Sequence, residues 1–144
     1  MKKTISLLII VFVLCASLTS CGFDEASVKA ELVGTWILED TSYFDGGGFY
    51  RHESCYVFYG NGEYYYLSVG QHYKSSGAVL GNPSVYEKNG TYKIKKDGIE
   101  MKSNEDKTSD MFYLWNDASG KITKLGSGFV KVSNSTDYLD NLTK

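Results

Sequence analysis

Residues 56–67 read YVFYGNGEYYYL and contain the clearest hairpin signal in the chain. Asn61-Gly62 favours a two-residue turn between antiparallel strands. With this pair at the turn, Phe58 lies opposite Tyr65 and shares a face of the sheet with it. We therefore expect the core face of the hairpin to hold Tyr56, Phe58, Tyr65 and Leu67. The outer face is then expected to be aromatic, with Tyr59, Tyr64 and Tyr66.

A second hairpin is expected over residues 92–103, around Asp97-Gly98. Charged and apolar residues alternate here, as in a strand with one buried face and one solvent-exposed face. In the expected register, Ile94 lies opposite Met101. The buried face then holds Tyr92, Ile94, Ile99 and Met101, and the exposed face holds Lys93, Lys95, Glu100 and Lys102. This pattern indicates an antiparallel sheet with one face on a core.

Further short β segments are expected along the rest of the chain. A first strand begins at Gly34 and ends at a glycine-rich loop, residues 45–48, and Gly81-Asn82-Pro83 is expected to be a turn. Twelve tyrosines, fifteen glycines and a single proline also suit strands joined by tight turns. We therefore expect an all-β fold, a small up-and-down antiparallel barrel of about eight strands, with a twisted β-sandwich as the alternative.

The first twenty residues have the order of a secretory signal peptide. Lys2 and Lys3 precede an apolar run from Ile5 to Leu14, and small or polar residues follow. The run is shorter than the roughly 20 apolar residues that a membrane-spanning helix needs. We expect a signal helix that is removed, rather than a retained membrane span.

Leu18-Thr19-Ser20-Cys21 follows the apolar run and resembles the lipobox of bacterial lipoproteins. The resemblance implies that the Cys21 thiol receives a diacylglycerol group and that Cys21 becomes the first residue of the mature chain. Acyl chains would then bind membrane lipid, at about 0.8 kcal/mol for each buried methylene. The implied location is the bacterial cell envelope, outside the cytoplasm, on the cell membrane or on the outer membrane of a host with two membranes.

Residues 32–38 read LVGTWIL and are similar to the opening of lipocalin-like proteins, in which Gly-x-Trp begins the first strand after a short helical turn. Later matches are the two hairpin turns and a late segment from Gly128 to Lys131. The resemblance implies a calycin-type barrel in which Gly34 and Trp36 mark the closed end. Lipocalins place an arginine of the last strand against this tryptophan, and the nearest candidate here is Lys131. The expected organisation is signal peptide 1–20, lipidated tether 21–30, lipocalin-like domain 31–133 and polar tail 134–144.

Charge and residue types narrow the functional classes. The formal net charge is −2 before Lys2 and Lys3 are removed, and no basic cluster occurs, so nucleic acid is not an expected partner. His52 and Cys55 would point to opposite faces of a strand, which argues against a metal site. Cys55 is expected to be a buried small hydrophobe. No nucleophile elbow or phosphate-binding loop appears, so we expect no enzyme, no catalytic residue and no cofactor.

Two hypotheses for function remain. In the first, the barrel holds a small apolar or amphipathic ligand. The residues expected to line that cavity are Tyr56, Phe58, Tyr65, Leu67, Tyr92 and Met101. In the second, the rings fill the barrel, because eight strands leave an interior just wide enough for side chains. The exposed tyrosine-rich face would then bind an envelope protein or a glycan.

Overall fold

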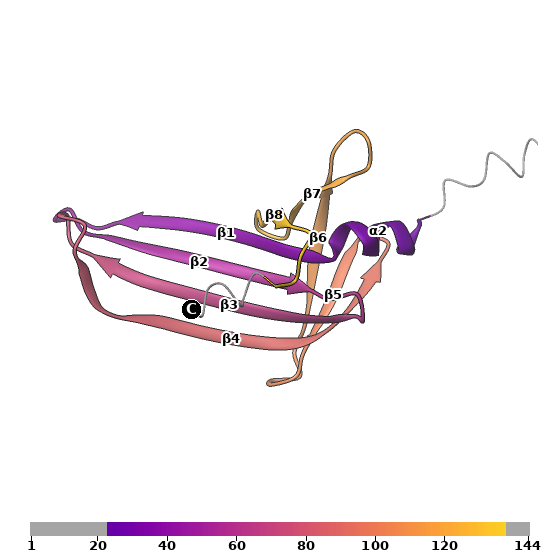
Figure 1. Cartoon of the computed structure of the whole chain (residues 1–144), viewed down its shortest axis with the longest axis horizontal. Coiled ribbons are helices and arrows are strands. Elements are labelled where there is room, and N and C mark those ends of the chain that lie inside the picture. The colour runs from indigo at the N-terminus through magenta and orange to yellow at the C-terminus, as the bar shows by residue number, and fades with distance from the viewer. Residues whose placement is uncertain (1–22, 138–144) are drawn as a thin grey trace, which may run out of the picture.

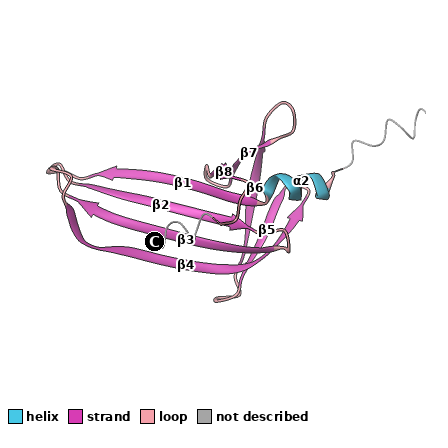
Figure 2. Ribbon diagram, viewed as in Figure 1, coloured by secondary structure: helices cyan, strands magenta, loops and turns pink. Residues whose placement is uncertain are grey.

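The computed structural model describes residues 23–137, which form one short helix and eight strands (Figure 2). The helix is α2 (Glu25–Leu32), which Asp24 caps at its N-terminus by accepting a hydrogen bond from the Ala26 amide. The strands are β1 (Gly34–Tyr43), β2 (Phe49–Phe58), β3 (Glu63–Tyr73), β4 (Val79–Lys95), β5 (Gly98–Ser103), β6 (Ser109–Asn116), β7 (Ile122–Leu125) and β8 (Val130–Ser133). The expected signal helix, the lipobox cysteine Cys21 and residues 138–144 of the expected polar tail lie outside the described residues.

The strands form one antiparallel sheet that curls into a nearly closed barrel. Their order is β7-β6-β5-β4-β3-β2-β1-β8. The two edge strands, β7 and β8, follow each other in the chain, and Leu125 and Phe129 form a β-bridge between them. Helix α2 covers one end of the barrel (Figure 1). The all-β, up-and-down prediction with about eight strands is therefore confirmed.

Strands β1 to β4 continue well beyond the barrel (Figure 1). Strand β8 pairs with β1 only over Thr35–Ile37, and β5 pairs with β4 only from Gly90 onward. Residues 38–54 and 68–86 therefore form a four-stranded sheet with no barrel strand beside it, which we call the extension. The end of the extension, residues 42–50 and 72–80, is called the tip, and the chain reverses there in the turns at residues 44–48 and 74–78. The tip lies at the opposite end of the molecule from α2 (Figure 1).

The hairpin at Asn61-Gly62 forms, but its predicted register is wrong by one residue. The Tyr59 amide donates a hydrogen bond of 2.9 Å to the Glu63 carbonyl oxygen, so the loop has three residues and Gly62 adopts a φ of +90°. Phe58 consequently pairs with Tyr64. A slip of one residue moves every side chain of one strand to the other face. The core face therefore holds Tyr56, Phe58, Tyr64 and Tyr66, whereas Tyr65 and Leu67 lie on the opposite face.

The second hairpin also differs in register, by two residues. Ile94 pairs with Ile99, and Met101 pairs with Tyr92. A two-residue shift leaves every side chain on its predicted face, because the side-chain period of a strand is two. Accordingly Tyr92, Ile94, Ile99 and Met101 are all buried, at 0% to 7% exposure.

Strand β4 is continuous through Gly81-Asn82-Pro83, so the turn predicted there is wrong. The chain reverses at residues 74–78 instead. The three residues form an irregularity in the pairing of β3 with β4, between the pairs Gly70–Ser84 and His72–Leu80. A bulge tolerates proline because its missing amide need not complete a regular ladder. The interruption therefore bends the strand without ending it.

The barrel interior is packed with rings. The centre of the Tyr56 ring lies between 4.5 and 6.1 Å from the centres of five other aromatic rings, those of Phe58, Tyr64, Tyr66, Phe112 and Phe129. Tyr92 packs edge-on against Phe58 at 5.3 Å. Such separations suit edge-to-face and offset ring pairs, which add to the stability gained by burial. Aliphatic side chains, among them Leu32, Ile94, Ile99 and Leu125, complete this core.

Candidate functional site

Trp36 closes the barrel at the end next to α2. Its side chain is fully buried, and its Nε1–H donates a hydrogen bond of 2.8 Å to the carbonyl oxygen of Leu32. The Nζ atom of Lys131 lies 5.7 Å from the Trp36 ring centre, within cation–π distance. The same ammonium group donates a hydrogen bond to the carbonyl oxygen of Glu31. Lys131 thus links the last strand, the first strand and the helix.

Gly34 is required where the chain leaves the helix and enters β1. Its φ is +128°, and a Cβ atom there would lie 2.3 Å from the carbonyl oxygen of Ser133. Any other residue would combine backbone strain with a clash against β8. The Gly-x-Trp sequence therefore has a local explanation in this structure: glycine permits the entry into the strand, and tryptophan fills the end of the barrel.

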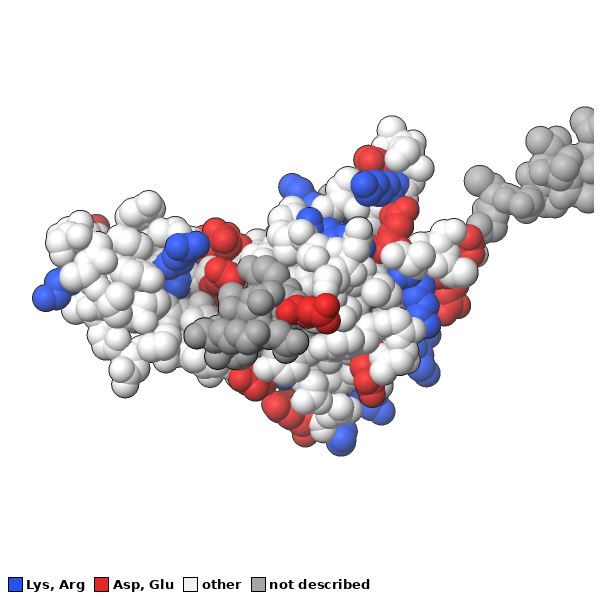
Figure 3. Space-filling model, in the orientation of Figure 1, with Lys and Arg blue, Asp and Glu red and all other residues white. Residues whose placement is uncertain are grey.

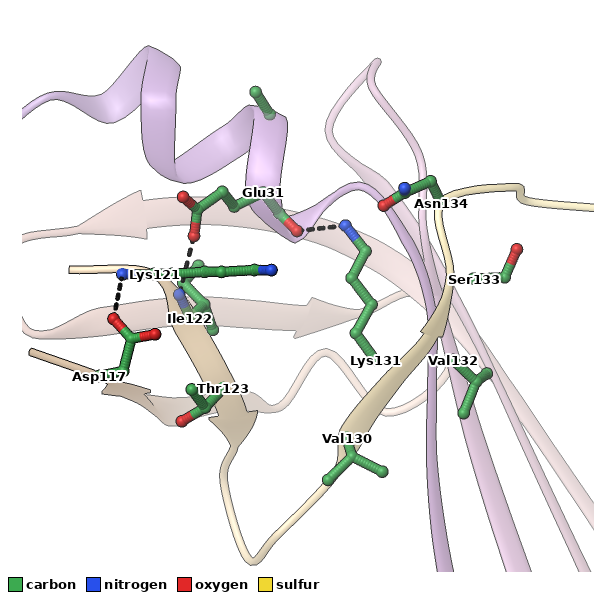
Figure 4. Close-up of a pocket in the computed structure, with 11 residues that line it drawn as sticks. Glu31, Asp117, Lys121, Ile122, Thr123, Val130, Lys131, Val132, Ser133 and Asn134 are labelled. Atoms are coloured by element: carbon green, nitrogen blue, oxygen red, sulfur yellow. Dashed lines mark hydrogen bonds between the residues drawn. The ribbon is translucent and has the colours of Figure 1, made fainter. Parts of the chain in front are cut away.

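A pocket of about 640 Å³ opens between α2, β7 and β8 (Figure 4). Its charged side chains are two acids and two bases: Glu31, Asp117, Lys121 and Lys131. The Glu31 carboxylate accepts a hydrogen bond of 2.8 Å from the Ile122 amide, and the Asp117 carboxylate accepts one of 3.1 Å from the Lys121 amide. Burial lowers the pKa of Lys131 below its ordinary value. These contacts hold the helix and the barrel edges together.

A second hollow, about 390 Å³ in volume, lies on the extension near its tip, and we call it the tip groove. Its lining residues are Ser42, Phe44, Tyr50, Gly70, His72, Asn82 and Ser84. Three of these residues supply rings. The His72 ring stacks on Phe44 at 5.7 Å and lies 4.6 Å from the Tyr50 ring, measured between ring centres. The remaining lining groups are hydroxyl, amide and backbone groups.

Tyr50 can lie in the tip groove because Gly70 has no side chain. A Cβ atom on Gly70 would be 1.7 Å from the Tyr50 hydroxyl oxygen. The tyrosine ring therefore occupies the space directly above the glycine. Its hydroxyl group shares a hydrogen bond of 3.3 Å with Ser84, which in turn donates one of 3.2 Å to the Gly70 carbonyl oxygen. These contacts fix the ring in a defined position.

A second aromatic row covers the opposite face of the extension. Phe49 lies between Tyr73, at 4.8 Å and nearly parallel, and Tyr43, at 6.0 Å. Tyr43 is 80% exposed, which is the greatest exposure among the large apolar side chains of residues 23–137. The tip therefore presents rings on both of its faces. Exposed aromatic groups of this kind mark interaction sites more often than they serve stability.

Between the tip groove and the barrel core lies a hydrogen-bonded row of polar side chains. His52 Nε2 is 2.5 Å from the Ser68 hydroxyl and 3.4 Å from the Ser54 hydroxyl. Ser54 is buried and shares a hydrogen bond of 3.1 Å with the Tyr66 hydroxyl. His52 also lies 6.1 Å from the Tyr50 ring centre. Because each buried polar group in this row has a partner, the row stabilises the junction of extension and barrel.

Charged side chains are sparse towards the tip (Figure 3). On the face in view they gather over the barrel end and the middle of the molecule, with only isolated groups at the far end of the extension. The Arg51–Glu39 ion pair, at 3.5 Å, has both side chains more than half exposed. A pair of this kind contributes little to stability. The tip turns carry Asp45 and Lys74, and the strand ends beside them carry the aromatic rings.

The residues that the sequence predicts as the lining of a cavity lie on two different faces of the sheet. Tyr56, Phe58, Tyr92 and Met101 are together in the core, whereas Tyr65 and Leu67 lie on the other face of the sheet. Tyr64 and Tyr66, expected on the outer surface, belong to the core. Cys55 lies on the face opposite His52, as strand alternation predicts, and is buried. Burial and the nearby Glu53 raise the pKa of the Cys55 thiol to about 11, so it is protonated and unreactive at neutral pH.

The sequence reasoning does not single out the tip groove. Phe44, Tyr50 and His72 are dispersed in the chain, and the only histidine weighed from the sequence is His52, as a metal ligand. Within residues 23–137, no three metal-binding side chains of His, Cys, Asp or Glu gather at one place. The sequence does contain a pattern that indicates part of the groove. Loop 45–48 separates two aromatic segments, so a hairpin there brings their rings to one end of the sheet. The contribution of His72, however, depends on the register of β3.

Comparisons with known proteins identify no relative. No protein-family model, no curated protein and no solved structure matches the chain. Within the described part, none of the helices has the length and apolar character to cross a membrane. Residues 23–137 therefore define a structural class only, an antiparallel, nearly closed eight-stranded β-barrel with a four-stranded extension.

Proposed function

We propose that this chain is a lipid-anchored protein of the bacterial cell envelope, outside the cytoplasm, that binds a partner through the aromatic tip of its extension. The single observation that carries the binding part is the tip itself, which exposes rings on both faces of a sheet that leaves the barrel. Burying such rings against a partner is favourable, at about 25 cal/mol for each Å² of apolar surface. The anchoring part depends on the lipobox of residues 18–21.

The packing of the barrel favours this hypothesis over a ligand held inside. Trp36 and Phe58 are fully buried, and Tyr56 contacts five rings. A ligand in the interior would have to displace several of these rings from close-packed positions, at a cost of several kcal/mol. The interaction hypothesis survives from the sequence, but with a different surface: the tip replaces the expected face of Tyr59, Tyr64 and Tyr66.

The shape of the molecule suits an anchored binder. Helix α2 begins at Glu25, only four residues after Cys21, and the tip is at the opposite end of the long axis (Figure 1). A lipid group on Cys21 would therefore hold the barrel near the membrane, with the extension able to point away from it. The filled barrel would act as a rigid base, and the tip would reach partners in the surrounding space.

Binding can be tested with bacterial envelope material and the full chain labelled with a fluorophore. Changing Tyr43, Phe44 and Tyr73 to Ser should abolish retention on this material. The matched control changes Met111, Tyr113 and Trp115 to Ser, because these side chains on β6 are also 47% to 63% exposed but lie outside the extension. Equal retention of both triple variants would contradict the proposal. Native mass spectrometry of the Cys21→Ser chain adds a second criterion, since a stoichiometric apolar molecule would support the barrel-ligand hypothesis instead.

The anchor can be tested separately by labelling with radioactive palmitate in a bacterial host. The unaltered chain should carry the label, and Cys21→Ser should lose it. Cys55→Ser is the control, because this cysteine is buried, on the face of the sheet opposite the barrel core, and should not affect labelling. Label retained on the Cys21→Ser chain would overturn the proposed anchor and leave the binding part untouched.

A further inference from the structure

The tip groove is lined without a formally charged carboxylate, ammonium or guanidinium group. None of its seven lining residues is Asp, Glu, Lys or Arg, although 22% of the whole chain is charged. A strongly charged ligand would lose hydration there without gaining an ion pair, which is costly. The groove's own lining therefore favours a neutral ligand, and the nearest charged groups, Asp45 and Lys74, line the adjoining hollow that shares Phe44 and His72 with it.

The groove combines ring faces with free polar side chains. The Phe44 ring stacks on the His72 ring at an interplanar angle of 24°, and Phe44 is 47% exposed, so part of its ring remains available to a ligand. Ser42 and Asn82 line the same hollow, and their side chains make no hydrogen bond with any residue of 23–137. A ligand with many hydroxyl groups can use these free donors and acceptors. Its apolar face can rest on the exposed Phe44 ring, because the negative face of an aromatic ring attracts the positive edges of C–H bonds.

We infer that the tip groove binds a neutral glycan, with a sugar ring lying against the exposed Phe44 ring and its hydroxyl groups bonded to Ser42 and Asn82. This inference rests on the proposed function and names the class of its partner. The groove volume of about 390 Å³ lies within the range of small-molecule sites, so it accommodates a short stretch of a glycan rather than a folded protein.

A peptide partner fits the β4 edge of the extension less well than a glycan fits the groove. A peptide strand would bind most readily by adding to a free sheet edge through main-chain hydrogen bonds. The extension has two free edges, β1 over residues 38–43 and β4 over residues 79–89, and the irregularity at Gly81-Asn82-Pro83 interrupts the second. Proline and bulges are features that prevent edge pairing. The β4 edge therefore lacks the regular ladder that peptide binding needs, and a peptide added to the β1 edge would be removed by the protease used in the second test below.

The direct test titrates the full chain, in detergent, with neutral hexose oligosaccharides of two to six sugars. Phe44→Ser and Asn82→Ala should each weaken binding by about tenfold, the effect of losing one ring contact or one pair of hydrogen bonds. Tyr113→Ser is the control, because Tyr113 is exposed and lies on β6, outside the extension. Equal melting temperatures of the variants would show that folding is unchanged. No binding by the unaltered chain, or equal binding by Phe44→Ser, would overturn the inference.

A second test separates the failure of this inference from failure of the proposed function. Envelope material is treated either with periodate, which cleaves vicinal diols of sugars, or with a protease. Glycan binding predicts that retention of the chain is lost after periodate and kept after protease. The reverse result overturns the glycan inference while the tip remains a binding surface for protein. Retention that survives the Tyr43, Phe44 and Tyr73 triple change would instead contradict the proposed function itself.

Discussion

The Tyr50 ring lies directly over Gly70 and occupies the space that a side chain at residue 70 would need. A Cβ atom on Gly70 would be 1.7 Å from the Tyr50 hydroxyl oxygen. Gly70→Ala should therefore push the ring into the tip groove and reduce neutral-glycan binding by at least about tenfold. The melting temperature should fall modestly, by about 4 to 8 °C, because the displaced ring loses the exposed Tyr50–Ser84 hydrogen bond, worth about 1 kcal/mol. Calorimetric titration and thermal unfolding measure the two effects.

The matched control for this prediction is Gly60→Ala. A Cβ atom there meets nothing within 4 Å, and Gly60 has no positive φ that would penalise alanine. This variant should bind as the unaltered chain does. Normal binding by Gly70→Ala would contradict this prediction. It would show that glycan binding does not depend on the position of the Tyr50 ring.

The register of the β2–β3 hairpin predicts unequal effects at two adjacent tyrosines. Tyr64 is only 3% exposed and packs among core rings, so Tyr64→Ala should lower the free energy of unfolding by about 3 to 5 kcal/mol. Tyr65 lies on the other face, and Tyr65→Ala should cost about 1 kcal/mol. Denaturant unfolding gives both values. A larger loss at Tyr65 would indicate the register that the Asn61-Gly62 turn alone suggests.

The contacts of Lys131 predict that its charge and its aliphatic packing both stabilise the closed end of the barrel. Lys131→Met keeps much of the aliphatic packing but removes the cation beside Trp36 and the hydrogen bond to Glu31. We expect a loss of about 1 to 3 kcal/mol in the free energy of unfolding. Lys131→Arg retains a cation and a donor and should recover most of that loss. If Lys131→Met unfolds at the same denaturant concentration as the unaltered chain, this link is not a stabilising one.

The raised pKa of Cys55 predicts a pH dependence with a definite sign. The thiol ionises near pH 9 in the unfolded chain but only near pH 11 in the folded one. Stability from the protonated, buried thiol is therefore complete below pH 9 and falls as the pH rises, by about 1 kcal/mol between pH 9 and 10. Cys55→Ala should remove this component, seen as a shallower fall in unfolding free energy over that interval. An identical pH slope in both chains would contradict the assignment.

Local sequence patterns correctly predict most elements of the fold. Alternation of charge around Asp97-Gly98 identifies a one-sided hairpin, and its faces tolerate a register error of two residues. The register of the hairpin at Asn61-Gly62, by contrast, could not be predicted from local patterns. Both of its strands are aromatic on both faces, so no polar face distinguishes the correct register from one shifted by one residue. The left-handed conformation of Gly62 adds a third loop residue and decides between them.

The candidate site depends on longer distances. Phe44, Tyr50 and His72 meet because β3 pairs with β2 in one register and because Gly70 leaves room for a ring. No local pattern contains that information, since it is a property of three separate segments. By itself, the sequence determined the all-β class and the entry into the first strand at Gly34-Thr35-Trp36, because these depend on adjacent residues, and the resemblance of residues 18–21 to a lipobox stays a prediction. Only the tertiary structure decided which tyrosines fill the barrel and which rings form the tip, because pairing register assigns each side chain to its face.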